Sequence, residues 1–81
     1  MIDRYIKMVL EDHEALTADG FDDALIGYTT NSNVVAVYDY QKCIDILMLE
    51  GMAFEDALEH MSYNVVNAYV GEKTPIFVVI P

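Results

Sequence analysis

Apolar and polar residues alternate along the first sixteen residues with the period of an α-helix. One side of that helix collects the apolar side chains and one histidine: Ile2, Tyr5, Ile6, Val9, Leu10, His13 and Leu16. The other side collects most of the charged side chains: Asp3, Lys7, Glu11, Asp12 and Glu14. This spacing predicts an amphipathic helix. We expect it to end between Thr17 and Asp19, because Gly20 is a natural helix terminator.

Two runs of strand-forming residues follow, separated by a short polar segment. The first run covers residues 24–30, the second covers residues 34–38, and Asn31-Ser32-Asn33 lies between them. β-branched and aromatic residues favour strands, and asparagine accepts the left-handed backbone angles of tight turns. The pattern therefore predicts a β-hairpin with a three-residue turn.

A second helix is predicted directly after the hairpin. Asp39 stands where an N-cap belongs, and Gly51 ends the helix. Its apolar stripe consists of Tyr40, Cys43, Ile44, Leu47 and Met48. Ile46 and Leu49 lie outside that stripe, so the helix is apolar on more than one side. We expect a further element to cover it, either the next helix or a second subunit.

A third helix and a last strand complete the predicted fold. The helix runs from Phe54 to about Tyr69, and Gly71 closes it. Its predicted inward residues are Phe54, Ala57, Leu58, Met61, Val65 and Ala68. Residues 76–80 form a continuously apolar run, which is typical of a strand covered on both faces or paired in the middle of a sheet. The order α-β-β-α-α-β predicts a single α+β domain over residues 1–81, with a three-stranded sheet, the hairpin plus the C-terminal strand, packed against helices.

The chain is strongly acidic, with 14 Asp and Glu residues against 4 Lys and Arg and a formal net charge of −10. That charge argues against nucleic acid or an anionic membrane as a direct partner, because both attract basic patches. It leaves three roles: binding a basic protein surface, binding a cation, or keeping the protein soluble. The apolar content is slightly above that of a typical domain, which favours a self-association surface over a disordered tail.

The sequence offers little catalytic chemistry. Cys43 lies on the apolar stripe of its helix, and buried cysteines behave as small hydrophobic residues. His13 and His60 lack the ligand spacing of a metal site, and the acids of residues 19–23 lack that of a calcium loop. We therefore expect no catalytic residue, no metal site, no cofactor and no enzymatic activity. The alternative, a small enzyme or metal binder, needs a pocket that joins a histidine with Cys43 and acids.

The compartment is predicted from the same sparse features. A single cysteine rules out an intramolecular disulfide and favours a reducing compartment. The first residues lack the basic start and apolar run of a signal peptide, and no stretch approaches the roughly 20 apolar residues of a membrane span. We expect a cytoplasmic protein.

The acids gather in two groups that contain no base, from Glu11 to Asp23 and from Glu50 to Glu59. Acids three or four positions apart on a helix lie roughly 5–6 Å from each other, close to the spacing of phosphates along nucleic acid. The first hypothesis is a non-catalytic interaction module for a basic protein surface, one form of which is a nucleic-acid-mimicking inhibitor of a nucleic-acid-binding protein. The predicted partner-binding residues are Glu11, Asp12, Glu14, Asp19, Asp22, Asp23, Glu55, Asp56 and Glu59. If the two groups lie apart in the fold, solubility explains them better.

The second hypothesis is a structural homodimer whose acidity serves solubility. Its predicted interface takes apolar residues from the second and third helices: Ile46, Leu49, Tyr63 and Val66. Tyrosine is enriched at interfaces because its side chain is large, stiff and half polar.

Three segments resemble a group of short, acidic, uncharacterised proteins from bacteria and their phages. They are residues 37–44 (VYDYQKCI), 55–59 (EDALE) and 67–77 (NAYVGEKTPIF), and the likeness covers residues 21–78. The AYVGEKTP run is its most specific part. Because no activity is known for that group, the resemblance implies no functional residues. Acidic inhibitors of defence systems occur among small phage proteins, so the resemblance implies a counter-defence role as one expectation.

Overall fold

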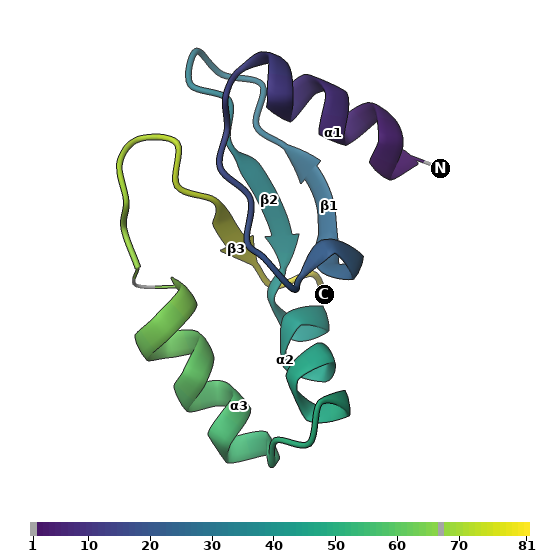
Figure 1. The fold of residues 1–81 in the computed structure, drawn as a ribbon, viewed down its shortest axis with the longest axis vertical. Helices are drawn as coiled ribbons and strands as arrows, with labels where there is room; N and C mark the ends of the chain where they lie inside the picture. The colour runs from purple at the N-terminus through teal and green to yellow at the C-terminus, as the bar shows by residue number, and fades with distance from the viewer. Residues whose placement is uncertain (1, 67) are drawn as a thin grey trace.

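The computed structural model describes residues 2–66 and 68–81, and their side chains from Tyr5 onward. Its elements are α1 (Ile2–Asp12), the 3-10 turn η1 (Asp22–Ala24), β1 (Leu25–Tyr28), β2 (Ala36–Asp39), α2 (Tyr40–Leu49), α3 (Phe54–His60), the π-helical segment η2 (Met61–Val66) and β3 (Ile76–Val78). The α+β class and the order α-β-β-α-α-β are confirmed (Figure 1). The inward placement predicted for Ile2 lies outside the described side chains, and position 67 of the third predicted helix lies outside the described residues.

The strands form one mixed sheet in the order β1-β2-β3. β1 and β2 are antiparallel, as the hairpin prediction requires, whereas β2 and β3 are parallel. Parallel neighbours need a long crossover, and α2, α3 and η2 supply it. The hairpin loop is longer than predicted and covers residues 29–35. Thr29 closes it, because its Oγ1 donates to the Asn33 carbonyl and accepts from the Val35 N–H, each at 3.0 Å.

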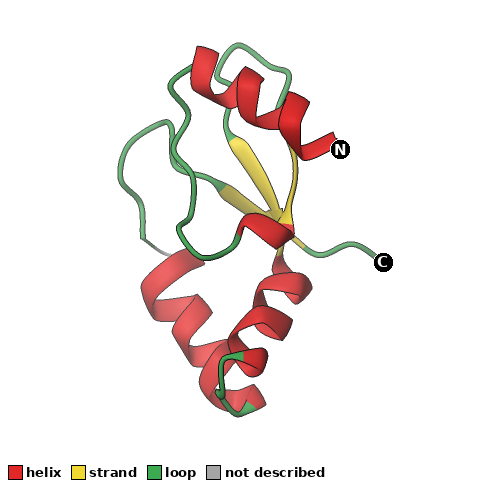
Figure 2. Cartoon of the chain, turned by 45° about the vertical axis from the view of Figure 1, so that its right-hand side comes forward, coloured by secondary structure: helices red, strands yellow, loops and turns green. Residues whose placement is uncertain are grey.

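One face of the sheet carries the core. Tyr38 is fully buried there and stacks on Phe77, with 5.3 Å between the ring centroids. α1 and the segment of residues 13–21 lie over this face (Figure 1 and Figure 2). The core combines residues from nearly every element: Ile6, Leu10, Phe21, Ala24, Leu25, Val34, Ala36, Tyr38, Cys43, Ile44, Leu47, Ala57 and Met61.

α1 ends earlier than predicted, at Asp12. The chain leaves the helix through a Schellman motif, in which the Ala15 N–H donates to the Leu10 carbonyl (2.9 Å) and the Glu14 N–H to the Glu11 carbonyl (3.1 Å). Glu14 takes the left-handed position of this motif, with φ of 56°. Gly20 is therefore not the terminator, and His13 and Leu16, which were predicted to face inward, are exposed.

α2 and α3 form a helical pair that extends beyond one end of the sheet (Figure 1). Asp39 is the predicted N-cap of α2, with its carboxylate accepting from the Lys42 N–H at 3.2 Å. α3 packs against α2, one of the two alternatives that its pattern left open, while Leu49 of α2 stays exposed. Some predicted inward positions are wrong: Met48, Phe54 and Ala68 are exposed. The outer sides of this pair have no sheet to pack on, and the π-helical turn of η2 shifts the phase of every later position.

The last strand forms as predicted, but its predicted position, covered on both faces or in the middle of the sheet, is wrong. β3 is an edge strand of three residues, and Ile76, Val79 and Ile80 are exposed. An uninterrupted apolar run is ordinarily a sign of burial on both faces. Here it lies at the border of the sheet, with no further strand beside it in the described residues.

Candidate functional site

The face of the sheet opposite the core is open. Side chains alternate along a strand, so the neighbours of Tyr38 and Phe77 point to this second face. They are Val37, Asp39, Ile76 and Val78, and all four are partly or fully exposed. The Asp39 carboxylate caps α2, so Val37, Ile76 and Val78 provide most of the surface of the open face.

The apolar character of the open face continues along the chain and beside it. Residues 74–81 contain no ionisable side chain, and Val79, directly after β3, is 62% exposed. Val66 of η2 lines a groove together with Tyr69 and Ile76, so the surface extends from β3 onto η2. We call Val37, Ile76, Val78, Val79 and Ile80 the β3 surface: the first three belong to the open face, and Val79 and Ile80 are the exposed residues directly after β3.

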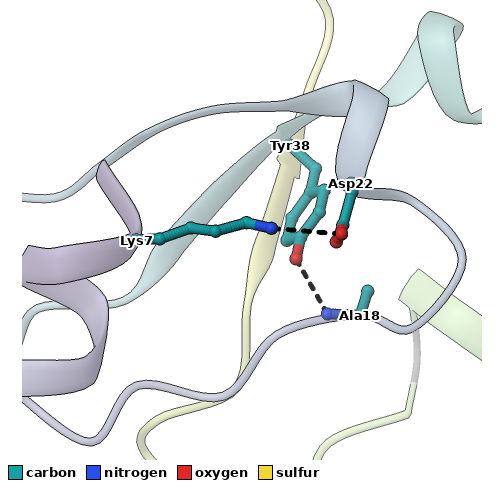
Figure 3. Close-up of polar contacts among 4 residues, drawn as sticks. All are labelled: Lys7, Ala18, Asp22 and Tyr38. Carbon is teal, nitrogen blue, oxygen red and sulfur yellow. Dashed lines mark hydrogen bonds and ion pairs between the residues drawn. The ribbon is translucent and has the colours of Figure 1, made fainter. Parts of the chain in front are cut away.

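The acids form no single cluster. All nine predicted partner-binding residues are exposed. However, the end of α1, which carries Glu11 and Asp12, lies near one end of the long axis and α3 lies at the other (Figure 1), and that axis measures 36 Å. Asp22 pairs with Lys7 at 3.1 Å (Figure 3). Asp19 lines a cavity together with His60, the residue after Glu59.

That cavity, of about 360 Å³, lies between the segment of residues 13–21, the helices α3 and η2, and β3. Phe21, Val65 and Phe77 contribute apolar walls, while Asp19, His60 and Asn64 add polar groups. His60 Nδ1 lies 3.4 Å from the Asn64 amide nitrogen. Sequence reasoning missed this hollow, because its three walls are far apart in the sequence.

Tyr38 holds one wall of the cavity in place. Its hydroxyl accepts a hydrogen bond from the Ala18 N–H at 2.8 Å, which ties residues 13–21 to the sheet (Figure 3). A second tie runs from the Leu16 N–H to the Lys73 carbonyl at 3.3 Å. Burial is the main cause that raises the pKa of Tyr38, so the phenol stays neutral and keeps its place in the core.

The reactive residue types are not brought together. Cys43 is buried, and burial, followed by the charge of Asp39, raises the pKa of its thiol to about 11. Cys43 does not line the cavity of His60, and His13 is exposed just beyond α1. Among the side chains of residues 5–66 and 68–81, no three of His, Cys, Asp or Glu are grouped closely enough to hold a metal ion. Within residues 2–66 and 68–81 no helix has the length and apolar character that a membrane crossing requires.

The four residues predicted for a dimer interface have different surroundings. Leu49 is 88% exposed and Tyr63 76%, and Val66 is exposed as well. Ile46 is only partly exposed and packs against the core. Sequence reasoning did not name the β3 surface, although its signal was present: an apolar run without a charge in a chain of net charge −10.

No family model, no curated protein and no solved structure matches this chain.

Proposed function

We propose that this protein is a non-catalytic protein-interaction module that contacts its partner through the β3 surface, with its acids serving solubility. The observation that carries the proposal is the edge position of β3, a charge-free apolar strand with no further strand on its outer side among the described residues. An edge strand presents a row of unpaired N–H and C=O groups to any extended chain.

Natural proteins usually protect such an edge. Lysine, proline inside the strand, a bulge or a covering helix all discourage pairing with another chain. β3 itself contains none of these residues, and its pairing with β2 runs in regular register over Val37–Ile76, Tyr38–Phe77 and Asp39–Val78. An unprotected apolar edge in an otherwise acidic protein supports a role in binding.

The non-catalytic part of the proposal is supported by the state of the reactive groups. A thiol with a pKa of about 11 is a poor nucleophile at neutral pH, because the thiolate is the reactive form. The buried position of Cys43 also keeps substrates away from it.

Site-specific photo-cross-linking in cells that produce the protein tests the proposal. A photo-reactive phenylalanine analogue replaces Val79 in one variant and Leu49, an apolar and even more exposed residue of α2, in the control. We expect cross-linked protein from position 79 and little from position 49. Equal yields from both positions, or none from position 79, would contradict the proposal.

A second function is supported by the acids of α3. Glu55, Asp56 and Glu59 are all exposed on one short helix, where they present a compact negative surface to a basic protein. One form of this function is a nucleic-acid-mimicking inhibitor, as in the first hypothesis from the sequence.

A basic peptide tests that second function. Glu55→Gln, Asp56→Asn and Glu59→Gln together should weaken binding of an oligolysine probe, and added salt should do the same. The matched control neutralises Glu11, Asp12 and Glu14 in the same way, at the other end of the molecule. Equal losses in both triple variants would show that total charge, and not the α3 surface, governs the binding.

A further inference from the structure

We infer that the occupant of the β3 surface is a second copy of this chain, paired antiparallel along β3 so that two three-stranded sheets join into one of six strands. The inference rests on the proposed function and specifies its partner.

The two edges of the sheet differ, and only one is suited to pairing. β1, at one edge, has an irregular register with β2 between Leu25 and Gly27, and α1 packs against it. Bulges and covering helices are common ways to block an edge. β3, at the other edge, pairs regularly with β2 and leaves Ile76 exposed. A contact through the sheet edge therefore uses β3.

Residues 76–80, which comprise β3 and the two residues after it, are complementary to themselves in the antiparallel direction, so pairing would extend the strand beyond Val78. If residues 76–80 of two copies pair around a two-fold axis at Val78, Ile76 lies opposite Ile80 of the other copy, and Val78 lies opposite its own equivalent. These side chains all point to the open face, because alternate residues share a face. β-branched residues directly opposite each other stabilise a sheet.

Symmetry selects the same arrangement. A two-fold axis makes an isologous contact, in which each copy uses the same residues and the assembly closes at two chains. A two-fold axis perpendicular to the sheet makes the two β3 strands antiparallel and keeps the open faces of both copies on the same side of the joined sheet. The antiparallel pair uses the free β3 edge of each copy. The irregular β1 strands then lie at the two ends of the six-stranded sheet.

Charge limits where two copies can meet. Each carries a formal net charge of −10, so contact is favoured where acids are absent, and residues 74–81 contain none. Most acids of the two groups lie along α1, residues 13–23 and α3, whereas Asp39 caps α2 beside Val78 and Glu72 lines the groove of Ile76. Added salt screens the repulsion between the copies and should strengthen the dimer. Binding of a basic partner responds to salt in the opposite direction, which separates the two functions.

Sedimentation equilibrium of the full chain tests the inference through a charge exchange at the proposed axis. Val78→Lys places two lysines opposite each other, and Val78→Glu places two glutamates. Each change alone should weaken the dimer about a hundredfold. An equal mixture of the two variants should recover a heterodimer, because each lysine then faces a glutamate. Recovery also shows that both variants fold.

A matched control separates this effect from a change in total charge. Leu49→Lys alters the charge of the chain by the same amount at an exposed apolar residue of α2, and it should leave the dimer intact. A dimer that Leu49→Lys dissociates and Val78→Lys does not would place the interface on the helices and overturn the inference.

The remaining outcomes distinguish this inference from the proposed function. If the wild-type protein stays monomeric at high concentration and high salt, the inference is overturned. Cross-links from position 79 to a different protein would then leave the proposed function standing. A wild-type dimer whose two charge variants fail to recover association on mixing would also overturn the pairing around Val78.

Discussion

The two faces of the sheet are built from neighbouring residues of the same strands. On the core face, Tyr38 is fully buried, stacks on Phe77 and accepts a hydrogen bond from Ala18. On the open face, Val37 and Val78 keep partial exposure although their side chains are as apolar as those of the core. Burial therefore alternates along β2, where Ala36 and Tyr38 are buried while Val37 and Asp39 are partly exposed.

The difference shows what apolar residues do when the fold does not cover them. A chain of this length buries only about 60–65% of the surface that its unfolded form exposes, so one layer of helix and loop covers only one face. The core face stabilises the domain. The open face, with the free edge of β3, is the surface that we propose contacts another molecule.

The largest expected effect compares neighbouring residues of β2. Tyr38→Ala should lower the free energy of unfolding by about 3–5 kcal/mol, because it opens a large cavity in the core. Val37→Ala should cost about 1 kcal/mol or less, since Val37 is only partly buried. Urea unfolding of both variants at low protein concentration measures the difference. Equal losses would show that the two faces contribute equally to the monomer.

A smaller effect isolates the hydrogen bond of the core face. Tyr38→Phe keeps the ring and its stacking on Phe77 but removes the acceptor of the Ala18 N–H. The loss should be about 1–3 kcal/mol, because a partly buried donor is left unsatisfied. Amide hydrogen exchange of Ala18 should become faster in the variant. Unchanged exchange at Ala18 would mean that the segment of residues 13–21 is held by other contacts.

The pH dependence of stability tests the burial of the Cys43 thiol in the core. Burial raises the pKa of the Cys43 thiol from 9.0 to about 11, so the fold favours the neutral thiol. The stability that the fold gains from the buried neutral thiol is fully present below pH 9 and is lost as the pH rises toward 11. The stability advantage of the wild type over Cys43→Ala should therefore shrink over that range in urea titrations. A constant difference between the two proteins would contradict the prediction.

The smallest effect concerns the start of the covering segment. Glu14 adopts a φ of 56°, which a side chain disfavours and glycine does not. Glu14→Gly should stabilise the protein by about 0.5–1 kcal/mol. Glu14→Gln is the matched control, because it removes the charge and keeps the strained backbone. An equal gain in Glu14→Gln would assign the effect to charge repulsion among the acids.

Local rules predicted much of the fold. The helix spacing of residues 40–49, the capping carboxylate of Asp39 and the glycine at position 51, with φ of 110°, agree with the structure. These features depend on contacts between residues close in sequence. The early end of α1 was missed because Glu14 occupies a left-handed position where glycine is usual.

The surroundings of each element were harder to predict, because they depend on the whole fold. The run of residues 76–80 is compatible with a central strand or with an uncovered edge, and only the strand order β1-β2-β3 decides between them. The exposure of each acid was predictable, but the separation of Glu11 and Glu59 along the molecule was not, since it follows from how α1 and α3 are placed.

Disulfide trapping at the two-fold axis tests the central claim most directly. A cysteine at Val78 should lie opposite its equivalent in the second copy and form an intermolecular disulfide under mild oxidation. A cysteine at Ile76 should not, because that residue faces Ile80 of the other copy and lies far from its own equivalent. Cys43 is buried and stays reduced in both variants. We predict dimer formation with Val78→Cys and monomer with Ile76→Cys; equal trapping at both positions, or none at Val78→Cys, would contradict the antiparallel pairing of β3.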